Sequence, residues 1–139
     1  MDGCKKYCLL CGEEHHVSIH HVLGQKDNKA LKKCAANKIS LCSGCHSFVH
    51  SKKGAELNNL LKLCFQNYIE FIFAKNEFTF KEIQELLEIT KSCTKQLIRD
   101  IPKNKNGNYD RDKIIDSIMV KTFNEEEANQ LLNGGICND

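Results

Sequence analysis

The chain has no long hydrophobic run, and it carries little net charge. Its most apolar stretch, Leu60 to Phe73, is too short to span a membrane and is interrupted by polar and charged residues. No internal repeat or low-complexity tract is present, which excludes a repeat array. No apolar leader follows Met1, so we expect a cytoplasmic protein with reduced thiols. At 139 residues the chain suffices for one ordinary domain or two very small ones.

The net charge of +2 is small because basic and acidic segments alternate along the chain. Residues 1–54 contain nine Lys or Arg and four Asp or Glu, and residues 90–113 contain seven and three. Residues 55–89 contain three and six, and residues 114–139 contain one and five. Two basic segments separated by an acidic one suit a polyanion that is held at two places. Charge clusters of this size also occur on ordinary solvated surface, and that alternative stays open.

Nine cysteines are an odd number, which argues against a complete disulfide framework. Four of them form two Cys-x-x-Cys pairs, Cys8/Cys11 and Cys42/Cys45. This spacing folds into a tight turn that places both sulfurs on one ion, and two pairs complete a tetrahedral zinc site. A redox pair normally occurs singly near a βαβ pattern, which is absent here. We therefore predict a structural zinc. We expect the other cysteines to be small buried residues or incidental thiols: Cys4, Cys34, Cys64, Cys93 and Cys137.

Four histidines lie close in sequence to these cysteines. His46 and His50 are four residues apart, and on a helix this spacing projects two imidazoles toward a single ion. His20 and His21 lie in a β-like run in which neighbouring side chains point to opposite faces. One of them can complete a metal site while the other faces a different region. A lone histidine is more often an ordinary polar residue, but four histidines beside a zinc-bound helix predict a second metal site.

The stretch from Tyr7 to His50 resembles an HNH endonuclease module, the β-β-α-metal fold, in its zinc-stapled variety. The motif of that family is a histidine-rich first strand, a central asparagine and a histidine on the helix. The resemblance implies that His21 is the general base and that Asn37 braces the loop and thereby orients the base. Many members have Asp where this chain has His20, and the all-histidine set resembles that of nuclease bacteriocins. The implied ligands of the catalytic ion are His20, His46 and His50.

This resemblance implies metal-dependent hydrolysis of a phosphodiester, with 5′-phosphate and 3′-hydroxyl ends as products. An imidazole base that deprotonates a water contributes about 10²–10⁴-fold to such a reaction. Three neutral imidazoles favour Zn²⁺, Ni²⁺ or Mn²⁺, and Mg²⁺ remains open because phosphate and water supply much of its shell. One active site cuts one strand, so a monomer should nick, whereas a double-strand break needs a homodimer or two events.

The rest of the chain is predicted to be helical. Apolar residues recur every three or four positions from Ala55 to about Lys75, which predicts a connector helix packed on two sides. Thr79 and Glu82 form a capping box before a helix over residues 80–88. Ser92 is the expected N-cap of a helix over residues 92–99, and Asp110 is the expected cap of a third.

The helices over residues 80–88 and 92–99 resemble a helix-turn-helix of the kind appended to phage and intron-borne endonucleases. Side chains of the second helix can read base edges or hold phosphates, and lysines in the following loop can reach the DNA backbone. A plain three-helix bundle with a polar face is the alternative. The predicted DNA-binding residues are Lys91, Lys95, Gln96, Arg99, Lys103 and Lys105.

We therefore predict an α+β protein with three parts: a nuclease module over residues 1–54, a connector helix over 55–76 and a helix-turn-helix-like module over 77–139. The predicted function is a homing-type, phage-borne or restriction endonuclease that acts on double-stranded DNA and not at a membrane. The rival from another class is a non-catalytic zinc protein that binds DNA for regulation, and an RNA-processing nuclease is a third, less favoured alternative.

Overall fold

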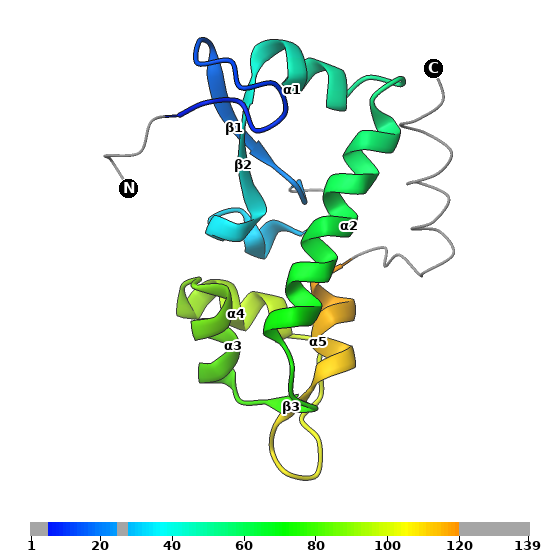
Figure 1. Cartoon of the computed structure of the whole chain (residues 1–139). Coiled ribbons are helices and arrows are strands. Elements are labelled where there is room, and N and C mark those ends of the chain that lie inside the picture. Colours follow the sequence, from blue (N-terminus) through cyan, green and yellow to red (C-terminus); the bar gives the residue numbers. More distant parts are fainter. Residues whose placement is uncertain (1–5, 25–27, 120–139) are drawn as a thin grey trace.

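The protein has a small α+β fold, as predicted, in a computed structural model that describes residues 6–24 and 28–119 (Figure 1). These residues form two short antiparallel sheets and five α-helices. The strands are β1 (Val17–His21), β2 (Lys38–Cys42), β3 (Glu77–Phe78) and β4 (Tyr109–Asp110). The α-helices are α1 (Ser43–Val49), α2 (Ala55–Ile72), α3 (Phe80–Leu87), α4 (Lys91–Ile98) and α5 (Arg111–Ile118), and the 3₁₀ turns are η1 (Lys29–Leu31) and η2 (Ala35–Asn37).

The first sheet consists of β1 and β2, which pair antiparallel with Val17 opposite Cys42 and His21 opposite Lys38. The predicted extended run is therefore a strand, and its neighbours do face opposite ways. His20 is buried, whereas Ile19 is 41% exposed. Helix α1 follows β2 without a loop, because Cys42 is both the last residue of the strand and the N-cap of the helix.

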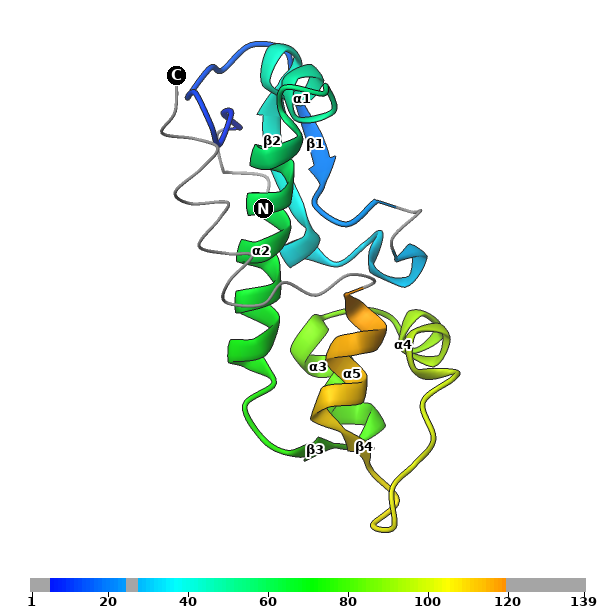
Figure 2. The ribbon, with the colours of Figure 1, turned by 90° about the vertical axis from the view of Figure 1, so that its right-hand side faces the viewer.

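Gly54 allows the chain to turn sharply from α1 into α2. A Cβ atom at this position would lie 1.8 Å from the carbonyl oxygen of Phe48, so a side chain would collide with the backbone. From this turn α2 runs along one side of the molecule, from α1 at one end toward β3 at the other (Figures 1 and 2). Arg111, the first residue of α5, donates from its Nη2 to the carbonyl oxygen of Glu70 at 3.0 Å and so holds the end of α2.

Helix α2 buries Leu63, Phe65 and Ile69. Leu63 and Phe65 are two positions apart and so lie on different sides of the helix, and packing on two sides stays a prediction. Tyr68, predicted to pack, is 40% exposed, and Phe71 is 81% exposed. Within the described residues, no helix combines the length and the apolar character needed to cross a bilayer.

The helix starts of the C-terminal half agree with the predictions at α3 and differ at α4. At α3, Thr79 Oγ1 accepts from the backbone N–H of Glu82, whose carboxylate accepts from the N–H of Thr79, so the capping box is confirmed. At α4 the N-cap is Thr90, whose Oγ1 accepts from Cys93 N at 3.1 Å. The predicted cap, Ser92, already lies inside the first helical turn.

Asp110 occupies the predicted cap position of α5, but its side chain makes no capping hydrogen bond. Its Oδ1 instead accepts from Asn104 Nδ2 at 2.9 Å, across the loop that precedes β4. The carboxylate of Asp110 therefore bonds to the loop and not to the N-terminus of α5.

Two hydrophobic cores stabilise the fold. The smaller core surrounds Leu41 and Val49 beside the cysteines of the first sheet. The larger core combines Val22, Leu23 and Leu31 with residues of α2 to α5. The larger core therefore crosses both predicted boundaries, at residues 54 and 76. The division into functional modules stays a prediction. The predicted third module extends to residue 139, and residues 120–139 lie outside the described part.

Candidate metal centres and catalytic residues

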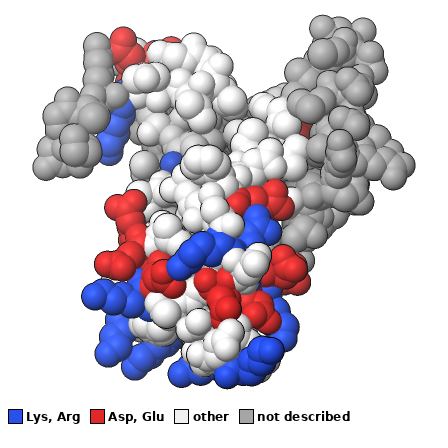
Figure 3. Space-filling view, turned by 60° about the horizontal axis from the view of Figure 1, so that its bottom comes forward, with Lys and Arg blue, Asp and Glu red and all other residues white. Residues whose placement is uncertain are grey.

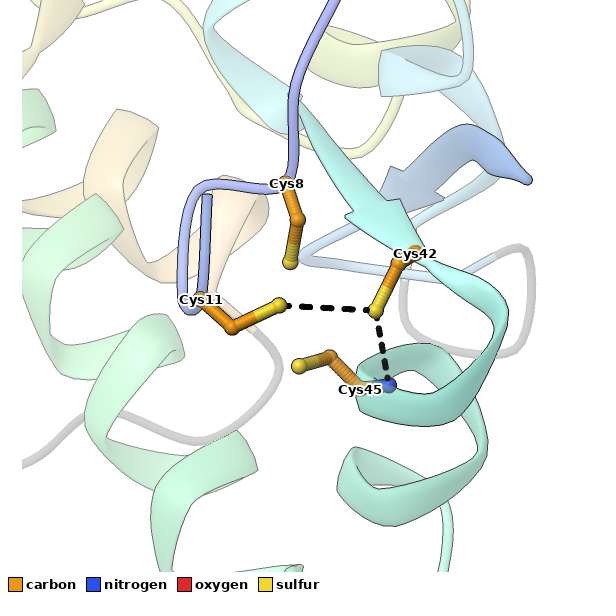
Figure 4. A group of neighbouring side chains, drawn as sticks. All are labelled: Cys8, Cys11, Cys42 and Cys45. Atoms are coloured by element: carbon orange, nitrogen blue, oxygen red, sulfur yellow. Dashed lines mark hydrogen bonds between the residues drawn. The ribbon is translucent and has the colours of Figure 1, made fainter. Parts of the chain in front are cut away.

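The four predicted zinc ligands lie together and can hold a structural metal such as zinc. Cys8 and Cys11 come from the segment before β1, Cys42 ends β2 and Cys45 lies in α1, and all four sulfurs point toward one centre (Figure 4). The sulfurs lie within 4.8 Å of one another. Those of Cys11 and Cys42 are 3.7 Å apart, close to the roughly 3.8 Å expected for tetrahedral zinc with bonds of about 2.3 Å.

The electrostatics of these sulfurs also suit a cation. Burial raises the pKa of Cys45 to about 12, and the thiols of Cys42, Cys8 and Cys11 add to the effect. At Cys8 burial acts in the same direction, but backbone N–H groups of Cys42, Cys11 and Leu10 outweigh it and lower the pKa to about 6. The lowered pKa favours the thiolate form of Cys8. The other thiols of the cluster lose their protons readily only when a positive ion lies at the centre.

A second cluster consists of the three predicted histidine ligands. Their ring centroids form a nearly equilateral triangle with sides of 5.0, 5.1 and 5.0 Å. His20 reaches the cluster from the inward face of β1, and His46 from α1. His50 is the C-cap of α1 and keeps a helical backbone, so the four-residue spacing acts as predicted. Each ring offers a nitrogen within 4.8 Å of the others, an arrangement that can hold one metal ion.

His20 fits a ligand role better than a role in the core. Its side chain is 2% exposed, yet its Nε2 has no hydrogen-bond partner within the described part of the chain. Leaving a buried polar atom unpaired costs about 1–3 kcal/mol, and an ion at the centre of the cluster would remove that cost. Burial, and then the neighbouring His46 and His50, lower the pKa of His20 to about 4. The ring is therefore neutral near pH 7, which is the form that binds metals.

His21, the predicted general base, is held by a backbone carbonyl. Its Nε2 lies 2.9 Å from the carbonyl oxygen of Lys32. Because a carbonyl only accepts, Nε2 must carry the proton in this contact, and Nδ1 of the neutral ring is then the free acceptor. This tautomer leaves a nitrogen that can take a proton from water.

Asn37, the predicted brace, is fully buried in the segment that follows β1. Its Oδ1 accepts from the N–H of Leu23 at 2.7 Å. Its Nδ2 donates to the carbonyl oxygens of Leu23 at 2.9 Å and of Leu31 at 3.1 Å. Leu31 precedes Lys32, so the amide fixes the backbone beside the carbonyl that holds His21. The contacts are those of a brace, and the catalytic role stays a prediction.

The predicted DNA-binding residues lie at the surface. On α4, Lys91, Lys95 and Gln96 are exposed, while Leu97 and Ile98 are buried as predicted. Arg99 at the end of α4 and Lys103 and Lys105 in the following loop are also exposed. On the face shown in Figure 3, lysine and arginine side chains lie along the lower rim, with acidic side chains between them. This face carries no single positive field, and DNA contact by these residues stays a prediction.

Two groups that contribute to the geometry around His21 were not predicted from the sequence. The carbonyl of Lys32 is a backbone group, which no residue pattern reveals. Asn28 N-caps η1 and also donates to carbonyl oxygens 89 and 90 residues further along the chain, a contact with no local signal.

A scan against protein-family models, a search of curated proteins and a search of solved structures found no match to this chain.

Proposed function

We propose that this protein is a metal-dependent HNH endonuclease that hydrolyses phosphodiester bonds of double-stranded DNA. The observation that carries the proposal is the unpartnered, buried Nε2 of His20 in a triangle with His46 and His50, one residue from His21. An ordinary core histidine would have a hydrogen-bond partner. A metal ligand next to an oriented base is an arrangement that can catalyse hydrolysis of a phosphodiester.

The cysteine cluster serves this site as a scaffold. Cys45 and His46 are adjacent residues of α1, but their side chains belong to different clusters. A structural ion on the four sulfurs fixes the start of α1 against the segment before β1. The position of His46 and His50 relative to His20 then follows from the geometry of the helix.

In the proposed reaction, Nδ1 of His21 accepts a proton from the attacking water, while Nε2–H remains bound to the carbonyl of Lys32. An ion held by the three histidines would supply charge stabilisation at a phosphate oxygen and at the departing 3′-oxygen. Neutral imidazoles suit Zn²⁺, Ni²⁺ or Mn²⁺, and Mg²⁺ is compatible. The products carry 5′-phosphate and 3′-hydroxyl ends. The helices α3 and α4 place the DNA, through exposed residues such as Lys95 and Arg99.

The test is the conversion of supercoiled plasmid to nicked circles by the purified protein. The assay uses Mg²⁺, Mn²⁺, Zn²⁺ or Ni²⁺, each with a chelator control. We expect metal-dependent nicking that His21→Ala reduces by about 10²–10⁴-fold, because the base is lost. His15→Ala is the matched control, since His15 is exposed and outside both clusters, and it should nick like the wild type.

A regulatory DNA-binding zinc protein is the second candidate, because α4 presents a polar, exposed face beside a buried one. This candidate needs the cysteines but not His21. Tight binding of DNA without relaxation of the plasmid by wild type or variant, across all four metals, would favour it and reject the nuclease. Cleavage of duplex RNA in preference to duplex DNA would instead indicate an RNA-processing enzyme.

A further inference from the structure

We propose that Asn28 is a positioning residue for His21, through which the helical unit (residues 77–119) supports the catalytic loop (residues 28–37). This inference rests on the proposed function, because it concerns the same base. It extends that function by assigning the C-terminal helices a second task besides placement of DNA. They hold the segment whose carbonyl orients the catalytic imidazole.

Asn28 joins two segments far apart in sequence. Its Nδ2 donates to the carbonyl oxygens of Ser117 and Ile118, each at 3.0 Å, at the C-terminal end of α5. The last carbonyls of a helix have no partner within the helix, so this amide satisfies two acceptors that would otherwise need water. Its Oδ1 accepts from the N–H of Ala30 at 3.1 Å and thereby starts η1. One side chain thus binds the end of one helix and the beginning of the catalytic loop.

Short contacts then connect Asn28 to the base. The turn that begins at Asn28 ends at Lys32, whose N–H donates to the carbonyl of Lys29 at 3.3 Å. The carbonyl of Lys32 accepts from His21 at 2.9 Å. The direction of that carbonyl depends on the pitch of η1, which depends on where Asn28 is held. Asn37 fixes the same turn from the other side through Leu31.

Further contacts show that the helical unit supports this loop along its length. Cys34 Sγ donates to the carbonyl of Leu87, the last residue of α3, at 3.3 Å, and the thiol is buried. Leu31 is fully buried in the same core as Leu97 and Ile98 of α4. In Figures 1 and 2 the loop lies between the first sheet and α4. The loop therefore packs on the helical unit, and within the loop Asn28 and Asn37 add side-chain hydrogen bonds of their own.

The experiment compares three variants of the full chain: Asn28→Ser, Asn28→Ala and Ser117→Ala. Asn28→Ser keeps an oxygen that can cap η1 but lacks the amide group that donates to both carbonyls of α5, whereas Asn28→Ala loses both functions. Ser117→Ala is the matched control. It removes the hydrogen bond from Ser117 Oγ to the carbonyl of Leu97 but leaves the backbone carbonyl that Asn28 binds.

Two readouts separate positioning from general stability. The first is the nicking rate over a range of plasmid concentrations, which resolves kcat from KM. We expect both Asn28 variants to lose kcat on the order of 10- to 100-fold with little change in KM, because a misplaced base slows the chemical step and leaves DNA binding intact. Ser117→Ala should keep both parameters.

The second readout does not require activity. In ¹⁵N NMR spectra of the zinc-loaded chain, the Nε2–H proton of His21 should be protected from exchange, with a scalar coupling across the bond to the Lys32 carbonyl. The signal should persist in Ser117→Ala and be lost in both Asn28 variants. A wild type without this coupling, or without one from Asn28 Nδ2 to Ser117, overturns the proposal even if every variant unfolds.

The outcomes distinguish this proposal from the proposed function. A wild type that shows the couplings but never nicks DNA rejects the nuclease and, with it, the role of Asn28 in catalysis. A wild type that nicks, with Asn28→Ser equal to it in kcat and in the His21 signal, leaves the nuclease standing and rejects the link to α5.

Discussion

Amide side chains in the catalytic loop and hydroxyl side chains at the helix starts bind backbone groups that regular secondary structure leaves without partners. Asn28 and Asn37 together bind four backbone carbonyls and two N–H groups, those of Leu23 and Ala30. The loop contains only two short 3₁₀ turns, so without these amides much of its buried backbone would lack partners. Single residues therefore hold a segment that neither a strand nor a long helix stabilises.

At this scale the corrected cap of α4 gives a direct test. Thr90→Ala should destabilise the protein by about 1 kcal/mol, because the N–H of Cys93 loses its acceptor. Ser92→Ala is the matched control and should change stability by only a few tenths of that value, since Ser92 is exposed and makes no capping bond. Urea denaturation followed by circular dichroism measures both. Equal losses in the two variants would contradict the cap assignment.

Among the elements, the two most constrained are the cysteine-bound start of α1 and the loop between α4 and β4. At the start of α1 four sulfurs from three segments meet, in an arrangement that can hold a metal ion. The loop depends on Glu77 of β3, whose carboxylate accepts from the side-chain amides of Asn104 at 2.7 Å, Asn106 at 3.1 Å and Asn108 at 3.1 Å. Each element is thus organised around one centre, the four sulfurs at α1 and the carboxylate of Glu77 in the loop.

The cysteine site predicts a separation of structure from activity. Cys42→Ser should lower the bound zinc by one ion per chain and unfold the segment around the first sheet, because it removes a thiolate ligand while serine can still cap α1. Cys64→Ser, at an exposed thiol of α2, is the matched control and should keep zinc and fold. His50→Ala should remain folded but should not nick plasmid. Atomic emission and circular dichroism check these outcomes, and unchanged zinc in Cys42→Ser would contradict the assignment of the site.

The loop predicts a dependence of stability on pH. Hydrogen bonds from Asn104, then Asn108 and Asn106, lower the pKa of Glu77 from its ordinary value of 4.5. The ionised carboxylate therefore stabilises the folded state above about pH 4.5, and this contribution disappears as the pH falls through the lower folded pKa.

Glu77→Gln should accordingly be less stable than the wild type at pH 7, and the difference should be smaller at pH 3. Urea denaturation at the two pH values tests this, with Glu85→Gln on the exposed side of α3 as the control. A gap between wild type and Glu77→Gln that is as large at pH 3 as at pH 7 would show that the carboxylate charge does not matter.

Much of the candidate site and several helix starts could be predicted from the sequence, because they depend on spacing within a few residues. The positions of the cysteine pairs, of His46 and His50, and of Thr79 and Glu82 are local patterns, and the structure brings each set together. The exposure of Tyr68 and Phe71 on α2 could not be predicted, because periodicity records apolar character without saying how much of a helix is covered. The contacts of Asn28 span about ninety residues and could not be read from any local pattern.

For the whole molecule, the important feature is that the larger core is shared. Val22, Leu23 and Leu31 from the predicted nuclease module are buried beside Ile83, Leu97 and Ile114 from the helices. A fragment without the helices would expose those side chains to water, and each costs about 1.5–3 kcal/mol when its burial is lost.

A fragment of residues 1–76 should therefore fail to adopt a fixed structure even with zinc bound to its cysteines. We expect poorly dispersed amide signals for residues 22–37 in its NMR spectrum and no metal-dependent nicking. The full chain with zinc is the control. A fragment with well-dispersed signals and wild-type nicking would show that residues 1–76 are an independent nuclease.

The close contact at Gly54 has a consequence for how the chain tolerates change. In a library that randomises residues 51–56 and selects folded protein, position 54 should return glycine alone, since any Cβ would meet the carbonyl of Phe48. Exposed neighbours such as Lys52 and Lys53 should accept many residue types. This single invariant position sets the direction in which α2 leaves α1, and so the route by which half of the chain returns to the catalytic loop.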